Sequence, residues 1–562
     1  MKTLWWLTFS LVLAASTFGG AHAAPAQARG PGWVTVVNDA DYMPTPVCDP
    51  VVPGAGCRHF NSFNQPSVNA AGLVVFRARS RGGGGTGEPV QGIYTRDMAA
   101  AGPIVRVLDR NTVVPPPDNR GSVFTESPSF PRIDIDSSTI AVRGNHPPVW
   151  QVVDDTGAVI GQAGTSGIYT DPFGVLVTGA ARLGAIPYFR FLQVPGSSGT
   201  SFDVFPGAPA VTDGDVIVFK GNYTRDGVSR TGVYYRELTD APLFLPDRNA
   251  LSPAGGDLPV VLIANNVDTP IPGTDTVFGS VAPPSAAGRM AVFAGFDDED
   301  APTLGGIYRA RLDGPRPALG ALVSIGGPVP GVPGARFNRL GEALSFNGRL
   351  VAFWGAWGTD TMSRVLPCPT EGNRDRIAYC AARYPEGFTV QVPVHQGIFV
   401  YDLRTRQLHT VATSPGDFRD FLYWNYSGHV PGTGEGDGEP ARWRAGAFMA
   451  VSSPAHGNGA RFRVAFKART GPVAGGRSVN PVDGIYLGEG PGPTRLRALV
   501  TTGIPGTRLD PEAFDPESGA PLPVTELGIE RDAFRGGYLV IDAGMGNDEN
   551  GWAGIYMATL PR

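Results

Sequence analysis

The chain has 562 residues, a formal charge of −5, 77 glycines and 53 prolines. Hydrophobic residues make up 42% of it, which excludes a disordered chain, because such chains lack the apolar residues that build a core. The acidic balance and the lack of a Lys/Arg-rich block exclude a nucleic-acid-binding protein, which must neutralise phosphates. Many short strands joined by turns would explain both the apolar content and the abundant glycine and proline.

Residues 1–23 have the pattern of a secretory signal peptide. Lys2 supplies the positive start, "LWWLTFSLVLAA" is the apolar core, and "AHA" at residues 21–23 is a small-x-small cleavage site. This run is too short for a membrane span, and no later segment is long and apolar enough. We therefore expect a secreted or periplasmic protein without a membrane span.

Four cysteines form two local pairs, Cys48 with Cys57 and Cys368 with Cys380. In an oxidising compartment such spacing predicts two disulfides that staple loops. A zinc site would need tighter spacing and histidine partners. The second pair lies in a long insert at residues 358–388, whose Arg and Tyr side chains make it a candidate recognition element.

A Gly-Ile-Tyr triplet or a near copy recurs through the chain. The seven copies begin at Gly92, Gly167, Gly232, Gly306, Gly397, Gly484 and Gly554. An apolar strand such as "GLVVFRAR" precedes each copy, and a Pro-Gly turn followed by an aromatic residue lies further upstream in most units. Such self-similarity is the signature of a repeat architecture.

Each unit predicts four strands with turns between them, and helical periodicity is almost absent outside residues 1–23. Seven such units predict an all-β fold, a seven-bladed β-propeller of four-stranded antiparallel blades, within a single domain at residues 24–562. The Ile and Tyr of a triplet should pack on opposite neighbours, and the Gly should permit a close backbone approach. The predicted blades span about 60–110, 128–180, 202–245, 277–325, 337–413, 441–502, and 521–560 plus 33–38.

The last unit stops after its third strand. The segment "GWVTVVNDADYMP" near the start resembles the fourth strand and exit of other units. We therefore expect residues 33–38 to pair beside residues 554–559 and close the ring.

The pattern N-x-x-G-x-x-x-(A/V)-F followed by G-I-Y resembles the NxxGxxxAF-type tandem repeats of bacterial exported proteins. It is more distantly similar to TolB-type propeller repeats. "NAAGLVVF" and "FNGRLVAFWG" carry the resemblance best, and "DIDSSTIAVRG" in the second unit departs from it. The resemblance implies a fold and transfers no catalytic residue.

Long, variable loops should share one face of the propeller, which is where binding usually lies. The loop "GFDDEDAP" brings Asp297, Asp298 and Asp300, and "GMGNDENG" brings Asp548 and Glu549. Carboxylates on loops suit a hard cation such as Ca²⁺, although neither loop matches a known calcium motif and both could be solvated hairpin tips.

Two functions are open. The first is a non-catalytic, exported, monomeric propeller that binds a protein, glycan or cell-surface ligand on the long-loop face. The second is a carbohydrate-active enzyme, a polysaccharide lyase or hydrolase, with His146, His395, Tyr223 and Arg143 as candidates for proton transfer. No nucleophile, zinc-protease or phosphate-loop motif occurs. The four candidates would have to converge in one cleft.

Overall fold

The computed structural model describes residues 31–560 except for short internal segments, which are 46–47, 50–52, 55, 83–88, 119–120, 154–155, 157, 245–249, 371–372, 417, 429, 432–439, 454–461, 475–476, 479, 491–494 and 547–549. The expected signal peptide lies outside the described residues. In the described part of the chain, the one α-helix, α1 (Arg374–Arg383), is far too short to cross a membrane.

Antiparallel sheets account for almost all of the regular structure, and seven of the sheets in the described residues are meanders of four strand positions. The innermost strands are β3 (Ser67–Val68), β7 (Arg132–Ile133), β13 (Ala210–Thr212), β20 (Ser285–Ala287), β25 (Ser345–Phe346), β33 (Met449–Ser452) and β40 (Phe534–Arg535). The second strands are β4 (Leu73–Ser80), β8 (Ile140–Asn145), β14 (Val216–Arg225), β21 (Met290–Phe296), β26 (Leu350–Trp357), β34 (Phe462–Thr470) and β41 (Tyr538–Met545).

The third strands carry the Gly-Ile-Tyr triplets. They are β5 (Gln91–Asp97), β11 (Ser166–Thr170), β15 (Val228–Glu237), β22 (Gly305–Arg311), β29 (Gln396–Asp402), β37 (Val482–Gly490) and β42 (Trp552–Thr559). The outer strands are β6 (Ile104–Asp109), β12 (Val177–Ala181), β18 (Val261–Asn265), β23 (Leu319–Ser324), β30 (Gln407–Ser414), β38 (Arg495–Thr501) and β1 (Trp33–Asn38). In four blades a further short strand pairs with the second strand: β2 (Phe60–Phe63), β19 (Ser280–Val281), β24 (Phe337–Leu340) and β39 (Val524–Gly528).

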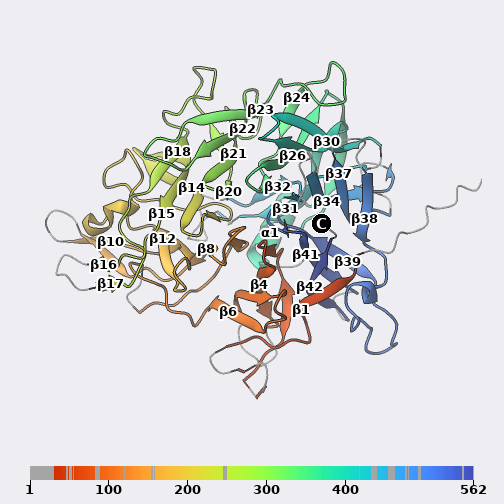
Figure 1. Ribbon diagram of the computed structural model, residues 1–562, viewed down its shortest axis with the longest axis horizontal. Helices are drawn as coiled ribbons and strands as arrows, with labels where there is room; N and C mark the ends of the chain where they lie inside the picture. Colours follow the sequence, from red (N-terminus) through yellow and green to blue (C-terminus); the bar gives the residue numbers. More distant parts are fainter. Residues whose placement is uncertain are drawn as a thin grey trace, which may run out of the picture. The chain divides into compact units, whose positions relative to one another are not determined.

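The innermost strands contact one another in a closed cycle. The order runs β3, β7, β13, β20, β25, β33, β40 and back to β3. The sheets are thus arranged around a common centre in Figure 1. This arrangement confirms the predicted seven-bladed β-propeller, in which strand edges are short and protected.

The N-terminal strand closes the ring. β1 pairs antiparallel with β42, with Trp33 opposite Ala558 and Asn38 opposite Gly554, and the two strands lie side by side in Figure 1. Asp510 holds this junction, because its Oδ2 accepts hydrogen bonds from Asn38 Nδ2 at 2.9 Å and Tyr556 Oη at 3.1 Å. The predicted closure by residues 33–38 is confirmed.

The aliphatic and aromatic residues of the triplets pack on opposite sides of their blade. In the fifth blade, Ile398 lies in a core cluster with the sixth blade, and Phe399 lies in one with the fourth blade. The fourth blade repeats this, with Ile307 toward the fifth blade and Tyr308 toward the third. Alternation along a strand therefore joins each blade to both of its neighbours.

The glycine of the triplet lies where the outer strand comes closest. A Cβ on Gly306 would stand 2.1 Å from the carbonyl oxygen of Val323, and one on Gly397 would stand 2.6 Å from that of Ala412. The register shifts by one residue immediately after Ile307 and after Ile398, which is a β-bulge. The predicted close backbone approach is thus present, and a side chain at these positions would clash with the outer strand.

The structure also contains two-stranded hairpins outside the blades, which the sequence did not predict. They are β9 (Trp150–Val153) with β10 (Val159–Ala163), β16 (Leu243–Phe244) with β17 (Ala250–Ser252), β27 (Thr361–Leu366) with β28 (Phe388–Pro393), β31 (Tyr423–Ser427) with β32 (Arg442–Gly446), and β35 (Val473–Ala474) with β36 (Arg477–Ser478). Because the β16–β17 hairpin precedes β18, the third blade reaches beyond residue 245. Two 3₁₀ turns, Pro187–Leu192 and Gly506–Arg508, complete the regular structure of the described residues.

Candidate functional site

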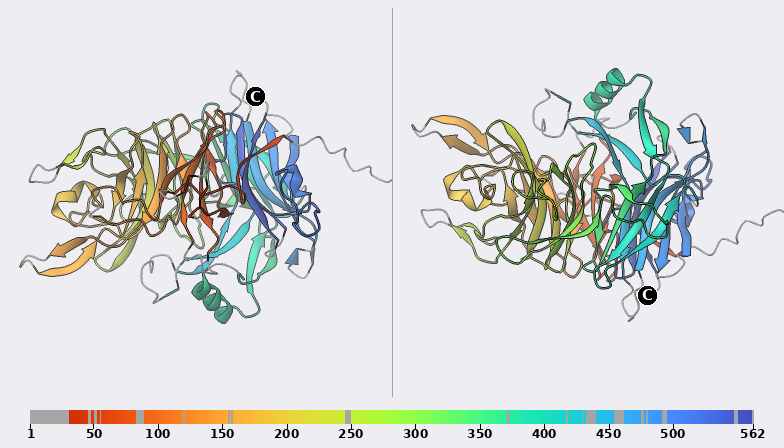
Figure 2. Two further views of the ribbon diagram at one scale, coloured as in Figure 1. Left: turned by 90° about the horizontal axis from the view of Figure 1, so that it is seen from below. Right: turned by 90° about the horizontal axis from the view of Figure 1, so that it is seen from above.

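One face of the propeller carries the connections between second and third strands and the connections between blades. We call it the long-loop face. Four of the hairpins lie in these connections, namely β9–β10, β27–β28, β31–β32 and β35–β36. The helix α1 joins β27 to β28, and Figure 2 shows it standing out from this face.

A cleft of about 220 Å³ opens among the loops of the fourth, fifth and sixth blades. We call it the blade 4–6 cleft. Its polar and aromatic lining comes from the β21–β22 loop (Glu299, Asp300), from β24 and the residues after it (Arg339, Glu342), from β28 (Gln391) and from β31 (Trp424). Side chains more than 100 positions apart in the chain therefore meet in one place.

An ion pair ties the acidic loop to the β31–β32 hairpin at the edge of this cleft. Arg442 of β32 contacts the carboxylate of Glu299, and its Nη1 lies 3.7 Å from Asp300 Oδ1. Trp424 on the neighbouring strand is partly buried, and its Nε1 has no hydrogen-bond partner among the described residues. Because Nε1 is buried, the apolar ring is the part of the Trp424 side chain that the cleft offers to a ligand.

The predicted calcium-binding carboxylates are used within their own loop. Asp297 Oδ1 accepts hydrogen bonds from the backbone N–H groups of Thr303 and Leu304, both at 2.9 Å. Although partial burial opposes ionisation, a hydrogen bond from the Thr303 hydroxyl and these backbone bonds together hold the pKa of Asp297 below its usual range. Asp298 Oδ1 likewise accepts from the N–H groups of Asp300 and Ala301 at 2.8 Å.

The carboxylates of this loop therefore have separate roles as turn caps and as partners of Arg442. Asp548 and Glu549 lie outside the described residues. The described residues contain no group of three or more His, Cys, Asp or Glu side chains placed to hold a metal ion.

His146 belongs to a buried cluster in the second blade. Its Nε2 lies 3.7 Å from Asp118 Oδ2, and its Nδ1 lies 3.0 Å from the carbonyl oxygen of Pro147. Tyr169, the triplet tyrosine of this blade, donates a hydrogen bond of 3.0 Å to the same carboxylate oxygen of Asp118. Burial raises the pKa of Asp118. These groups are closed off from solvent in this structure.

The other proposed proton-transfer residues lie apart from that cluster or are buried. Arg143 is in β8 of the same blade and Tyr223 is in β14 of the third blade, and both are buried. His395 precedes β29 of the fifth blade, with its side chain about one-third exposed and its Nε2 3.6 Å from Asp360 Oδ2. The structure thus distributes the four candidates over three blades, and only His395 among them has substantial exposure.

Two further histidines, His59 and His409, have local roles. His59 Nδ1 lies 3.0 Å from the carbonyl oxygen of Ala40, and its ring lies 4.0 Å from that of Tyr42. His409 lies in the outer strand β30, where burial lowers its pKa. His429 and His456 lie outside the described residues.

Both predicted disulfides are present. Cys48 is bonded to Cys57 and Cys368 to Cys380. The second bond joins the end of β27 to α1, which is capped by the side chain of Asn373 accepting from the N–H of Arg376. The disulfide therefore cross-links the insert internally and holds α1 close to the end of β27.

A titratable cluster between the sixth and seventh blades was not anticipated. Lys467 of β34 lies 4.1 Å above the ring of Tyr423, and burial lowers its pKa. Asp542 of β41 faces the same cluster, and burial together with the nearby Glu526 raises its pKa to about 7. Both follow the core of an apolar second strand, in "VAFKAR" and "LVIDAG". A charged residue directly after the apolar core of a second strand is the sequence signal that could have predicted this cluster.

Comparison with protein-family models and with curated protein sequences gives no match. Among solved structures, an oligogalacturonate lyase in complex with manganese is similar over 95% of this chain and 99% of its own, with 9% identity and a TM-score of 0.36. A puromycin-hydrolyzing peptidase from Mycobacterium tuberculosis is similar at 11% identity and a TM-score of 0.27, with 63% of its own length covered. We draw no functional inference from similarities at these scores.

Proposed function

We propose that the protein is an exported, non-catalytic propeller that binds a glycan in the blade 4–6 cleft. The observation that supports this best is the meeting of Trp424 with hydrogen-bonding groups of the fourth and fifth blades in one open cleft. Sugars present apolar ring faces that pack on an indole and hydroxyls that bond to carboxylates, amides and guanidinium groups. Gln391 and Arg339 supply such groups beside the indole.

The charges around the cleft favour a neutral glycan over an anionic one. Glu299, Asp300 and Glu342 line the cleft together with Arg339, and Arg442 stands behind the first two carboxylates. Three carboxylates against two guanidinium groups leave a net negative charge. A polyanion would lose binding free energy through repulsion and through desolvation of its own charges.

The test is a binding screen of the purified mature protein against neutral oligosaccharides (cello-, xylo- and manno-oligosaccharides) and against polygalacturonate and alginate. We expect one of the neutral series to bind and Trp424→Ala to weaken binding at least tenfold, the typical loss for an aromatic contact of about 1.4 kcal/mol or more. Tyr188→Ala is the matched control, because Tyr188 is a highly exposed aromatic residue that does not line the cleft. Its affinity should be unchanged.

Three other outcomes of the screen would each contradict a different part of the proposal. Binding that Trp424→Ala leaves intact would move the site elsewhere on the molecule. Release of ultraviolet-absorbing ends from the anionic polysaccharides would favour the lyase alternative, with His395 as the first residue to substitute. Binding of a protein partner without any glycan would contradict the proposed ligand class while leaving the propeller a binding protein.

A further inference from the structure

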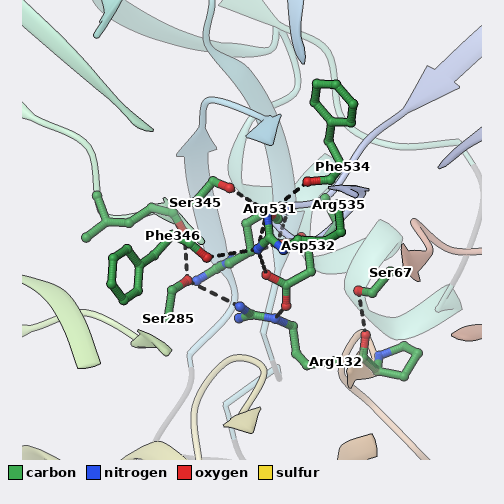
Figure 3. A network of polar contacts seen from close by, with 12 residues as sticks. Ser67, Arg132, Ser285, Ser345, Phe346, Arg531, Asp532, Phe534 and Arg535 are labelled. Atoms are coloured by element: carbon green, nitrogen blue, oxygen red, sulfur yellow. Dashed lines mark hydrogen bonds and ion pairs between the residues drawn. The ribbon is translucent and has the colours of Figure 1, made fainter. Parts of the chain in front are cut away.

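A central ion-pair network and the pairing of β1 with β42 both join the seventh blade to the rest of the ring. In the network, Asp532 of the seventh blade pairs with Arg132 of the second blade and with Arg535 of its own blade, as Figure 3 shows. Burial raises the pKa of Asp532, but the two guanidinium groups outweigh this effect and hold that pKa below its usual range. The charge of Asp532 therefore does not change near neutral pH.

Two carboxyl groups lie at the outer junction, where the end of β1 meets the start of β42. Asp39 directly follows β1, and its Oδ2 accepts a hydrogen bond of 2.9 Å from the backbone N–H of Ala553. Asp510 Oδ2 accepts from a side chain of each strand, namely Asn38 Nδ2 at 2.9 Å and Trp552 Nε1 at 3.1 Å. Both carboxyl groups therefore hold β1 against β42.

The two carboxyl groups differ in how well their oxygens are satisfied. Asp510 Oδ1 also accepts a hydrogen bond from the N–H of Glu512 at 3.0 Å, so both of its oxygens have donors. Asp39 Oδ1 is buried and has no hydrogen-bond partner among the described residues. A buried carboxylate oxygen without a donor costs free energy that a neutral carboxyl group largely avoids. The junction therefore favours the neutral form of Asp39.

The charged and titratable groups around Asp39 come from several segments. Asp510 repels the ionised form, whereas Arg81, directly after β4, attracts it. Tyr556 of β42 is neutral because burial raises its pKa, and Asp41 accepts a hydrogen bond from a backbone N–H of β1 at 3.0 Å. Burial has the largest effect on Asp39 and raises its pKa to about 7, although the bound backbone N–H and Arg81 lower it.

We propose that Asp39 makes the outer closure of the ring sensitive to pH. The neutral side chain holds β1 against β42. When Asp39 ionises, its unpartnered oxygen and its repulsion by Asp510 loosen the pairing of the two strands. The opening is confined to β1, because Asp532 keeps the seventh blade tied to the centre. β1 is therefore the part of the ring that loosens as the solution changes from mildly acidic to mildly alkaline.

Hydrogen exchange of the full mature protein measures this opening. The opening constant of a segment is its exchange rate divided by the intrinsic rate of the unfolded chain at the same pH. The stability that neutral Asp39 contributes is complete below about pH 4 and is lost as the pH rises through about 7. We therefore expect the opening constant of β1, relative to that of β21 in the fourth blade, to rise at least about tenfold between about pH 5 and about pH 8.

Asp39→Asn should remove this rise, because the amide keeps an oxygen for the N–H of Ala553 but cannot ionise. Asp39→Ser, with a smaller neutral side chain, should remove it as well. Asp515→Asn is the matched control near the same strand, since Asp515 Oδ2 accepts from Asn550 Nδ2 at 3.4 Å. Backbone N–H groups lower the pKa of Asp515, so this variant should retain the rise.

Two results would overturn the proposal. A constant ratio of the opening constants of β1 and β21 from about pH 5 to about pH 8 would show that ionisation of Asp39 does not act on the closure. A full rise in Asp39→Asn would assign the pH dependence to another group.

Discussion

Asp542 shows how one residue of the repeat acquires unusual chemistry. It lies on β41, where its Oδ1 is buried and has no hydrogen-bond partner in the described part of the chain. Burial and the carboxylate of Glu526 raise its pKa to about 7, and the cation of Lys467 offsets this only in part. The carboxyl group is therefore protonated in the folded protein at mildly acidic pH and ionised in the unfolded chain.

Asp542→Asn should reveal this shift as a pH-dependent change in stability. A raised folded-state pKa contributes stability that is complete below about pH 4 and lost as the pH rises through about 7. The variant does not lose stability in this way. The difference in free energy of unfolding, variant minus wild type, should therefore rise by about 2 kcal/mol between about pH 5 and about pH 8. Urea unfolding at the two pH values measures it.

Asp515→Asn is the matched control for this prediction. Asp515 lies on an exposed turn, where N–H groups of Ser518 and Glu517 lower its pKa. Its contribution is therefore lost only in more acidic solution, and the difference from wild type should stay constant from about pH 5 to about pH 8. If Asp542→Asn also gave a constant difference, the raised pKa would be wrong.

At the scale of the strand pair, the triplet glycine governs how third and outer strands fit together. Gly306→Ala would place a Cβ 2.1 Å from the carbonyl oxygen of Val323, which is backbone and cannot rotate away. We expect a loss of about 2–4 kcal/mol in the free energy of unfolding, the range for overpacking and backbone displacement in a core. Chemical denaturation with intact folding cooperativity measures this loss.

Gly102→Ala is the control for the same substitution. Its added Cβ would have its nearest contact at 3.5 Å, an ordinary van der Waals distance, with Asp97. The stability should change by less than about 0.5 kcal/mol. Equal losses at the two positions would contradict a specific clash between residue 306 and the outer strand.

The elements differ in how far their sequence predicts them. The blade strands can be predicted from the apolar run, the triplet and the turn residues. One such turn is at Asn69, whose Oδ1 accepts hydrogen bonds from the N–H groups of Ala71 and Leu73. The insert does not, because α1 spans only ten residues and is held by Asn373 and the Cys368–Cys380 bond rather than by a long apolar face. Short elements stabilised by caps and covalent links leave little periodic signal.

At the scale of the whole molecule, β1 completes the seventh blade and closes the cycle of inner strands. Protein beginning at residue 39 would leave β42 with an unpaired edge and would lack Val36 and Val37, whose fully buried side chains cover part of the core cluster of the seventh blade. We expect such a protein to aggregate or to unfold at a Tm at least about 10 °C lower, because an open ring exposes both its apolar faces and a strand edge.

Protein beginning at residue 31 is the control, since it retains β1, and it should unfold like the mature chain. Circular dichroism melting and size-exclusion chromatography distinguish the two proteins. Equal stability of both would mean that three strands suffice for the last blade and that closure by β1 contributes little.

The sequence by itself determined the blade count, the strand order, the closing strand and both disulfides. These depend on local patterns, namely strand alternation, turn residues and spacing, which each unit repeats. The tertiary structure alone decided which side chains meet: Trp424 with Glu299 in the cleft, and Arg132 with Asp532 among the inner strands. Residues 125 and 400 positions apart become neighbours only after the ring closes. Burial then changes the strength of the electrostatic interactions that charged side chains make. Periodicity along one strand contains no information about either effect.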